Sequence, residues 1–230
     1  MNIATQFDDI QAINHPWKQI MNTGQYDLID PNKWLVHYIL TLSKQLKMPY
    51  LDLGCGFGRH LLPMLNSQSV SIGLDINIPE SLFQLSKTTP GLNLTIGYMH
   101  KLPFKNNSVG IVLSWRSLYL QKLKNIKRTI SEIKRILAPG GYFIGSVRTT
   151  TNTLCKIAAS AAVNIEPNTF NFSDNELFGA IYHFFSKDEI LNLLSEFRVE
   201  NFYLKELRHT SYTTAYSYYP NDFWIFIVKK

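Results

Sequence analysis

Cysteine is scarce in this sequence of 230 residues, and long apolar runs are missing. Cys55 and Cys155 are the only cysteines, too few for a disulfide framework or a structural zinc site. No apolar stretch approaches the roughly 20 residues of a membrane-spanning helix. The first residues also lack the basic-then-apolar pattern of a secretory signal peptide. We therefore expect a cytoplasmic protein that has reduced thiols, no membrane contact and no metal site.

Acidic residues are nearly missing from one stretch, residues 116–135, which holds seven basic residues and only Glu132 opposing them. Ile126, Ile130 and Ile133 recur there at helical spacing, so the basic residues fall on the solvent face of an amphipathic helix. The alternative is a landing surface for an anionic partner such as RNA.

Strands and helices alternate through the first two thirds of the chain, with no internal repeat. Two helices are expected at 7–22 and 32–47, with Asp30 as the cap of the second. Further helices are expected at 59–66, 79–87 and 125–137, and strands at 50–53, 69–75, 92–98, 109–115 and 142–147. This alternation predicts an α/β fold in which a parallel, doubly wound sheet carries helices on both faces.

The alternation breaks at 149–185, which shows no clear strand. Ser186 and Glu189 then form a capping-box pattern that opens a helix reaching about Phe197. Strands at 199–207 and 222–229 follow without a helix between them and must be antiparallel. The expected whole is one domain, 1–230, with a single mostly parallel seven-stranded sheet and an antiparallel C-terminal strand. Its parts are a helical cap (1–47), a cofactor-binding core (48–148), a substrate-side insertion (149–185) and a final helix with a strand pair (186–230).

A glycine-rich turn follows the strand at 50–53, in the sequence Leu-Asp-Leu-Gly-Cys-Gly-Phe-Gly-Arg. Glycines at 54, 56 and 58 let the backbone turn sharply and approach a ligand closely. The dinucleotide pattern G-x-G-x-x-G would need a third glycine where Arg59 stands, and no P-loop lysine is present. Asp52 precedes the turn.

This turn resembles motif I of the class I S-adenosylmethionine-dependent methyltransferases. Three later segments, 72–75, 102–109 and 132–141, continue the resemblance in the family's order, so that it covers about 48–148. It implies methyl transfer with S-adenosyl-L-methionine as cofactor. The sequence departs from the family pattern at Tyr98 and Gly110, where acids are usual, and at Leu120, where a histidine is common.

The resemblance also implies a role for each matching residue. Asp75 would accept hydrogen bonds from both ribose hydroxyls, as a carboxylate can. Asp52 and the backbone of the glycine turn would face the methionine portion, and Met99 the adenine. The complete cofactor set is Asp52, Gly54, Cys55, Gly56, Gly58, Asp75, Ile76, Met99, His100 and Ser114.

Residues outside the matched segments are the candidates for the methyl acceptor. His183 is the candidate general base, because an imidazole titrates near neutrality; His209 and Tyr212 are weaker candidates. The expected substrate-side residues are aromatic: Trp17, Tyr26, Trp115, Tyr119 and Tyr182.

The predicted function is O- or N-methylation of a small molecule by in-line displacement. The segment after the fourth strand, Ser-Trp-Arg-Ser, lacks the Asn/Asp-Pro-Pro-Tyr and Pro-Cys patterns of adenine-N6 and cytosine-C5 methylation. Two alternatives remain: a methyltransferase acting on tRNA or other RNA, and a catalytically silent cofactor-binding module. The sequence leaves the oligomeric state open.

Overall fold

The computed structural model describes residues 16–22, 30–67, 69–173, 177–206 and 222–230. Seven strands form the main sheet: β1 (Tyr50–Leu53), β2 (Ser71–Asp75), β3 (Leu92–Ile96), β4 (Val109–Trp115), β5 (Leu137–Arg148), β9 (Arg198–Glu206) and β10 (Asp222–Lys229).

The strand order in this sheet is β3-β2-β1-β4-β5-β10-β9. The pairs from β3 to β5 are parallel, whereas β10 runs antiparallel to both β5 and β9. The predicted mostly parallel, seven-stranded sheet with an antiparallel C-terminal strand is therefore confirmed.

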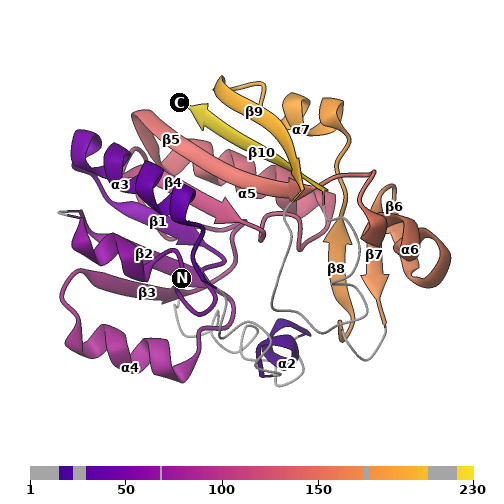
Figure 1. Ribbon diagram of the computed structural model, residues 1–230, viewed down its shortest axis with the longest axis horizontal. Helices are drawn as coiled ribbons and strands as arrows, with labels where there is room; N and C mark the ends of the chain where they lie inside the picture. The colour runs from indigo at the N-terminus through magenta and orange to yellow at the C-terminus, as the bar shows by residue number, and fades with distance from the viewer. Residues whose placement is uncertain (1–15, 23–29, 68, 174–176, 207–221) are drawn as a thin grey trace.

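Helices cover both faces of the sheet. In Figure 1, α3 lies in front of the strands and α5 behind them, while α4 lies beside the β3 edge. The helical segments are α2 (Pro16–Asn22), α3 (Lys33–Leu46), the 3-10 helix η1 (Leu62–Asn66), α4 (Glu80–Thr88), α5 (Leu123–Ile136), α6 (Thr153–Ala161) and α7 (Lys187–Leu193). Within the described ranges, none of these helices has the length and apolar character needed to cross a bilayer.

The centre of the sheet is buried on both faces. Every residue of β4 is buried, as expected for a strand with parallel neighbours on each side. Phe143 of β5 and Phe226 of β10 pack edge to face across the neighbouring strands, with ring centroids 5.0 Å apart. This core fixes the ends of the central strands in one rigid body.

Two local predictions were wrong. The cap of α3 is Asn32 and not Asp30: the Asn32 side-chain oxygen accepts a hydrogen bond from the Leu35 N–H at 3.1 Å. The segment predicted as a helix at 59–66 contains only η1, because Pro63 has no N–H to donate to the carbonyl four residues earlier.

The segment 149–185 also differs from its prediction. It holds α6 and a three-stranded antiparallel sheet of β6 (Val163–Glu166), β7 (Thr169–Phe172) and β8 (Ala180–His183). Figure 1 shows this second sheet to the side of the main sheet and separate from it. Strands of four residues give too short an alternation to detect in a sequence.

Ion pairs engage part of the basic stretch at 116–135. Arg135 contacts Glu132 on the same helix, with Nε and Oε1 2.7 Å apart, and Lys134 pairs with Glu196. The Glu132 carboxylate also accepts a hydrogen bond from the Leu102 N–H at 2.9 Å. This half of α5 therefore binds its own chain, as the amphipathic-helix interpretation expects.

Gly145→Ala should destabilise the fold. A Cβ at position 145 would lie 2.3 Å from Cζ of Phe226, a fully buried ring that has no space to move. Overpacking of this kind lowers the free energy of unfolding by about 1–3 kcal/mol, which chemical denaturation measures. Gly97→Ala is the matched control, because its Cβ would meet Leu74 at an ordinary 3.7 Å; equal stability of the two variants would contradict the packing described.

Candidate functional site

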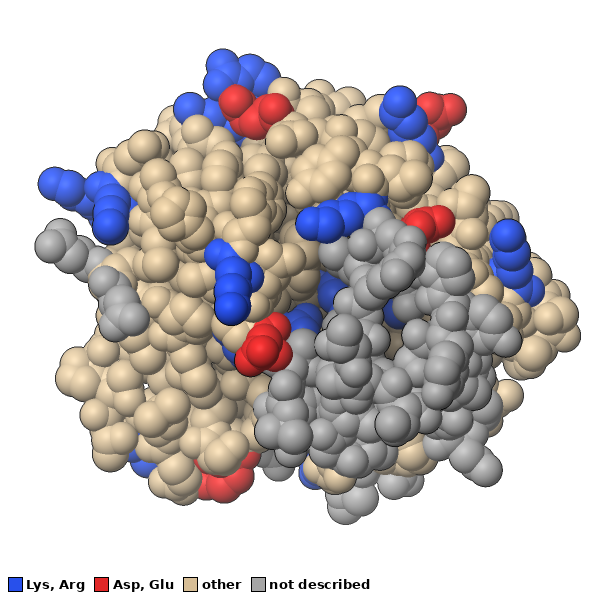
Figure 2. Space-filling model, viewed as in Figure 1, with Lys and Arg blue, Asp and Glu red and all other residues tan. Residues whose placement is uncertain are grey.

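A cavity of about 530 Å³ opens at the carboxyl ends of the parallel strands. Its walls come from the turn after β1, the ends of β2 and β4, the segment after β3, helix α2 and the start of β8. The strand order reverses between β1 and β4, which is where α/β sheets bind their ligands. Figure 2 shows the hollow near the middle of this face, with Lys and Arg atoms set back inside it.

The glycine turn forms one wall and leaves space for a ligand. Gly54 has a φ of +76°, and a Cβ there would lie 2.5 Å from Cβ of Ser117. Gly56 has a φ of +52°, and among the described residues other than its chain neighbours only Cε of Met21 would come within 4 Å of its Cβ, at 4.0 Å. A side chain at Gly54 would therefore collide with the protein, whereas one at Gly56 would enter the cavity.

Asp75 ends β2 beside this turn. Its Oδ2 accepts a hydrogen bond from the Gly56 N–H at 2.9 Å, and its Oδ1 accepts one from the Asn77 N–H at 3.1 Å. Burial raises the pKa of the Asp75 carboxyl, while these backbone donors act in the opposite direction. A carboxylate has about four lone-pair sites, so beside the backbone donors at Gly56, Ile76 and Asn77 it can accept from a further donor, such as a ligand hydroxyl.

Seven of the ten predicted cofactor residues line the cavity: Gly54, Cys55, Gly56, Asp75, Ile76, Met99 and His100. Gly58 and Ser114 lie behind the lining. A Cβ on Gly58 would meet Leu82 in the core, at 3.1 Å, and the Ser114 hydroxyl hydrogen-bonds the Ser117 hydroxyl at 2.8 Å. Ser117, which the sequence reasoning missed, reaches the cavity itself and donates to the Leu53 carbonyl at 2.6 Å.

Asp52 is the third predicted cofactor residue that does not line the cavity. It is buried within β1. Burial raises its pKa to about 7, although the nearby Arg59 charge acts to lower it. Asp52 therefore provides a carboxyl that changes charge near neutrality, close to the glycine turn.

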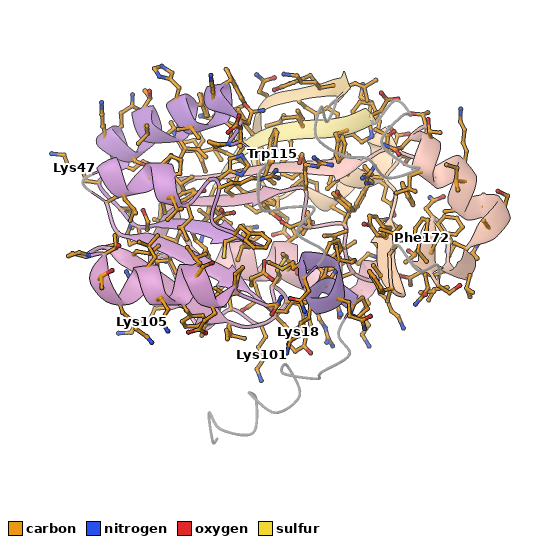
Figure 3. The ribbon with its side chains drawn as sticks, turned by 60° about the horizontal axis from the view of Figure 1, so that its bottom comes forward. Lys18, Lys47, Lys101, Lys105, Trp115 and Phe172 are labelled. Atoms are coloured by element: carbon orange, nitrogen blue, oxygen red, sulfur yellow. The ribbon has the colours of Figure 1, made fainter. Side chains whose placement is uncertain are left out.

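Aromatic side chains line the opposite end of the cavity, away from Asp75. The predicted substrate residues Trp17, Trp115, Tyr119 and Tyr182 all belong to this lining, and Figure 3 shows Trp115 near the middle of the molecule. The Tyr182 ring lies 5.8 Å from Tyr119 and 6.2 Å from Trp17, centroid to centroid. The remaining candidates Tyr26, His209 and Tyr212 lie outside the described residues.

The placement of His183 argues against its predicted role as a general base. It is fully buried and is not part of the cavity lining. Its Nδ1 hydrogen-bonds the Thr169 hydroxyl at 2.7 Å, and its Nε2 faces the Glu189 carboxylate at 3.3 Å. Burial lowers its pKa. The ring also packs edge to face on Phe185, with centroids 4.4 Å apart, so its contacts are with residues outside the cavity lining.

Gly110, one of the departures from the family pattern, has a structural explanation. A Cβ there would lie 2.7 Å from Cβ of Met48, because the segment before β1 packs directly on β4. The other two departures, Tyr98 and Leu120, line the cavity and so change its shape.

Several cationic residues of the cavity were missed by the sequence reasoning as site residues. Arg59, Arg116, Lys122 and Arg148 all belong to its lining. The sequence offers one signal for Arg116: it directly follows β4, and residues at the carboxyl ends of parallel strands lie beside ligand sites. Because Arg116 also begins the basic stretch, the amphipathic-helix interpretation places it on a solvent-exposed helix face.

A doubly wound sheet with a glycine turn and an acid at the ends of its first two strands defines an α/β protein that binds a nucleoside-containing cofactor. Comparison with known proteins narrows this class. Residues 51–145 match the family model described as a methyltransferase domain. The part of the chain that holds the glycine turn and Asp75 is therefore similar to a methyltransferase domain.

Curated relatives match parts of the chain. A demethylmenaquinone methyltransferase of Symbiobacterium thermophilum is 28% identical over 151 residues, which cover 60% of this chain and 55% of the relative. The human mitochondrial arginine-hydroxylase NDUFAF5 is 33% identical over 98 residues, which cover 42% of this chain and 28% of the relative. The chain thus spans about half of the first relative and about a quarter of the second.

Solved structures match over most of the chain. A SAM-dependent methyltransferase of Methanosarcina mazei aligns with a TM-score of 0.68 and 22% identity, covering 88% of this chain and 99% of its own. A 1,6-didemethyltoxoflavin-N1-methyltransferase of Burkholderia thailandensis, solved with 1,6-didemethyltoxoflavin and S-adenosylhomocysteine, aligns with a TM-score of 0.61 and 14% identity, covering 99% and 88%. At these identities the likeness shows the fold.

Asp52→Asn should change how stability depends on pH. Because the folded-state pKa of about 7 lies above the ordinary value of 3.8, the folded protein holds a proton that the unfolded chain has released. Asp52 therefore makes the folded state less stable as pH rises from about 4 to 7. Replacement by asparagine should flatten this decline in denaturation curves measured from pH 5 to 8. An unchanged pH profile would contradict the assigned pKa.

His183→Ala should destabilise the protein rather than disable its site. Removing the ring leaves a cavity and deprives the buried Thr169 hydroxyl of its shortest hydrogen bond, so the free energy of unfolding should fall by about 2 kcal/mol or more. Below the unfolding transition, the affinity for S-adenosylhomocysteine should stay within twofold of wild type. A variant of wild-type stability that has lost turnover would restore the general-base hypothesis.

Proposed function

We propose that this protein transfers a methyl group from S-adenosylmethionine to an oxygen or nitrogen atom of a small molecule. The observation that carries this proposal is the continuity of the cavity. One end combines the Gly56 opening with the Asp75 carboxylate, and the other end is lined by aromatic rings.

The residues at the first end suit an adenosine with an attached amino acid. Asp75 keeps acceptor capacity for ribose hydroxyls, and the space beside Gly56 lets a ligand approach the backbone closely. Ile76 and Met99 provide apolar surface for the adenine. When bound, the cofactor would supply an electrophilic methyl group on its sulfonium sulfur.

The chain's own contribution is orientation and exclusion of water. In-line displacement needs the acceptor atom aligned at about 3–3.5 Å from the methyl carbon. Tyr119, Tyr182 and Trp17 would hold an acceptor by ring contacts at the second end, where their rings cover part of the wall and reduce its contact with water. With His183 behind the wall, placement and alignment carry the reaction.

A small-molecule acceptor is favoured over RNA. Lys134 and Arg135 of the basic stretch are engaged in ion pairs, and Arg116 lines the cavity rather than the outer face of α5. Two of the similar proteins are named for the methylation of demethylmenaquinone and of 1,6-didemethyltoxoflavin, and neither name refers to RNA. An aromatic-lined cavity of about 530 Å³ has the size of a small-molecule site.

Methyl-labelled cofactor provides the test of activity. The protein is incubated with it and with separated small-molecule, RNA and protein fractions of a cell extract. We expect label in the small-molecule fraction. Label confined to RNA or protein would contradict the proposed acceptor, and cofactor binding without label in any fraction would indicate a silent module.

Asp75→Ala should weaken the binding of S-adenosylmethionine and of its demethylated product at least tenfold, about 1.4 kcal/mol or more. The lost carboxylate is the acceptor proposed for the ribose hydroxyls. Isothermal titration calorimetry measures the change. Asp188→Ala is the matched control, because Asp188 is an exposed acid of α7; equal affinities for both variants would remove the ribose assignment.

Gly56→Val should abolish cofactor binding. The valine side chain would extend into the cavity, where Cε of Met21, 4.0 Å from the added Cβ, is the nearest atom of the described residues outside the turn itself. Near-ultraviolet circular dichroism checks that the variant is folded. Wild-type affinity in a folded Gly56→Val protein would show that the cofactor lies elsewhere.

A further inference from the structure

The charges that line the cavity are unbalanced. Among the described lining residues, Asp75 is the only acid, and it stands at the end proposed for the ribose. Arg116 and Arg148 lie at the other end, where β4 and β5 finish side by side: Trp115, just before Arg116, is in register with Ser146. The end assigned to the methyl acceptor therefore carries two guanidinium groups.

The backbone holds Arg116 in an unusual conformation. Its φ is +63°, in the left-handed region that residues other than glycine rarely adopt. Its N–H donates to the Ser146 hydroxyl at 2.9 Å, and its guanidinium carbon lies 5.2 Å from the centroid of the Phe223 ring. Backbone strain of this kind persists where the surroundings enforce it, and it clusters at ligand-binding sites.

Arg148 is fixed from several sides. It is only 8% exposed, and its Nη1 donates to the Asn152 side-chain oxygen at 3.3 Å. Its guanidinium carbon lies 5.0 Å from the centroid of Phe223, 5.6 Å from that of Tyr119 and 5.7 Å from that of Tyr182. Contacts with aromatic faces stabilise a cation in a largely buried place.

Arg116 and Arg148 share the ring of Phe223, which itself is fully buried. Both arginines belong to the lining of the cavity, so an anion bound at this end would be attracted by two positive charges. Guanidinium groups bind carboxylate and phosphate oxygens in pairs of parallel hydrogen bonds. The same place offers Tyr119 and Tyr182 as apolar walls.

We infer that the methyl acceptor is an aromatic or apolar molecule that carries an oxyanion, a carboxylate or a phosphate, held by Arg116 and Arg148. This inference rests on the proposed function, because it takes the aromatic end of the cavity as the acceptor site. It adds the charge of the substrate and the two residues that select for it.

The test measures binding of simple probes, with and without saturating S-adenosylhomocysteine. Phenylacetate, phenyl phosphate and the neutral phenylacetamide are titrated by calorimetry at low ionic strength, where charge pairing is least screened. We expect at least one acid to bind tenfold or more tightly than the amide. The acid that binds more tightly identifies the oxyanion as carboxylate or phosphate.

Variants assign the binding to the two arginines. Arg116→Gly and Arg148→Gln should bring the acids to the affinity of the amide, and Arg148→Lys, which keeps the charge and loses the paired donors, should give an intermediate value. Glycine suits a positive φ, so Arg116→Gly should keep or raise the thermal midpoint. Lys105→Gln, an exposed lysine seen pointing outward in Figure 3, should behave as wild type.

Two results would overturn the inference. One is that the acids bind no better than the amide in a folded wild-type protein. The other is that Arg116→Gly and Arg148→Gln weaken S-adenosylhomocysteine as strongly as they weaken the acids, because the arginines would then serve the cofactor's own carboxylate. The proposed function would fail in a different way, if wild type did not bind S-adenosylhomocysteine at all. In that case the titrations of the acids in the absence of S-adenosylhomocysteine would still test the anion site.

Discussion

The hydrogen bond from the Gly56 N–H to the Asp75 carboxylate joins the two halves of the cofactor end of the cavity. It ties the turn after β1 to the end of β2, two strands that are already paired in register from Tyr50 to Leu53. With the carboxylate held in place, the turn keeps its positive φ angles and the space beside Gly56 stays open. The proposed cofactor site depends on this hydrogen bond, because it fixes both the Asp75 carboxylate and the opening beside Gly56.

The fold could be predicted from the sequence to the extent that its elements are long or fully buried. The apolar run at 109–115 forms β4 with the predicted bounds, and it is recognisable because every residue of this central strand is buried and therefore the run is nearly all apolar. The short strands β6, β7 and β8 gave no such signal. Their placement depends on contacts with Arg148 and Tyr119 backbone groups far away in the chain, which no local pattern encodes.

The cofactor end of the cavity was more predictable than the acceptor end because its residues follow a local sequence pattern. Glycines and an acid at fixed spacing are local requirements of the turn, and the structure brings Gly54, Gly56 and Asp75 to the cavity. His183 was chosen for its imidazole and its place at the end of the insertion, and in the structure it is buried against Thr169, outside the cavity lining. The guanidinium pair on Phe223 is assembled from three separate strand ends, and only the tertiary structure shows it.

A crystal structure of the protein with S-adenosylhomocysteine is the most direct measurement. Bound as proposed, the ribose hydroxyls would hydrogen-bond the Asp75 carboxylate, the backbone at Gly56 would contact the ligand, and the sulfur would face the aromatic end lined by Tyr119 and Tyr182. Electron density for the ligand at any other place, with the cavity beside Gly56 left to solvent, would contradict both the assigned site and the direction of methyl transfer.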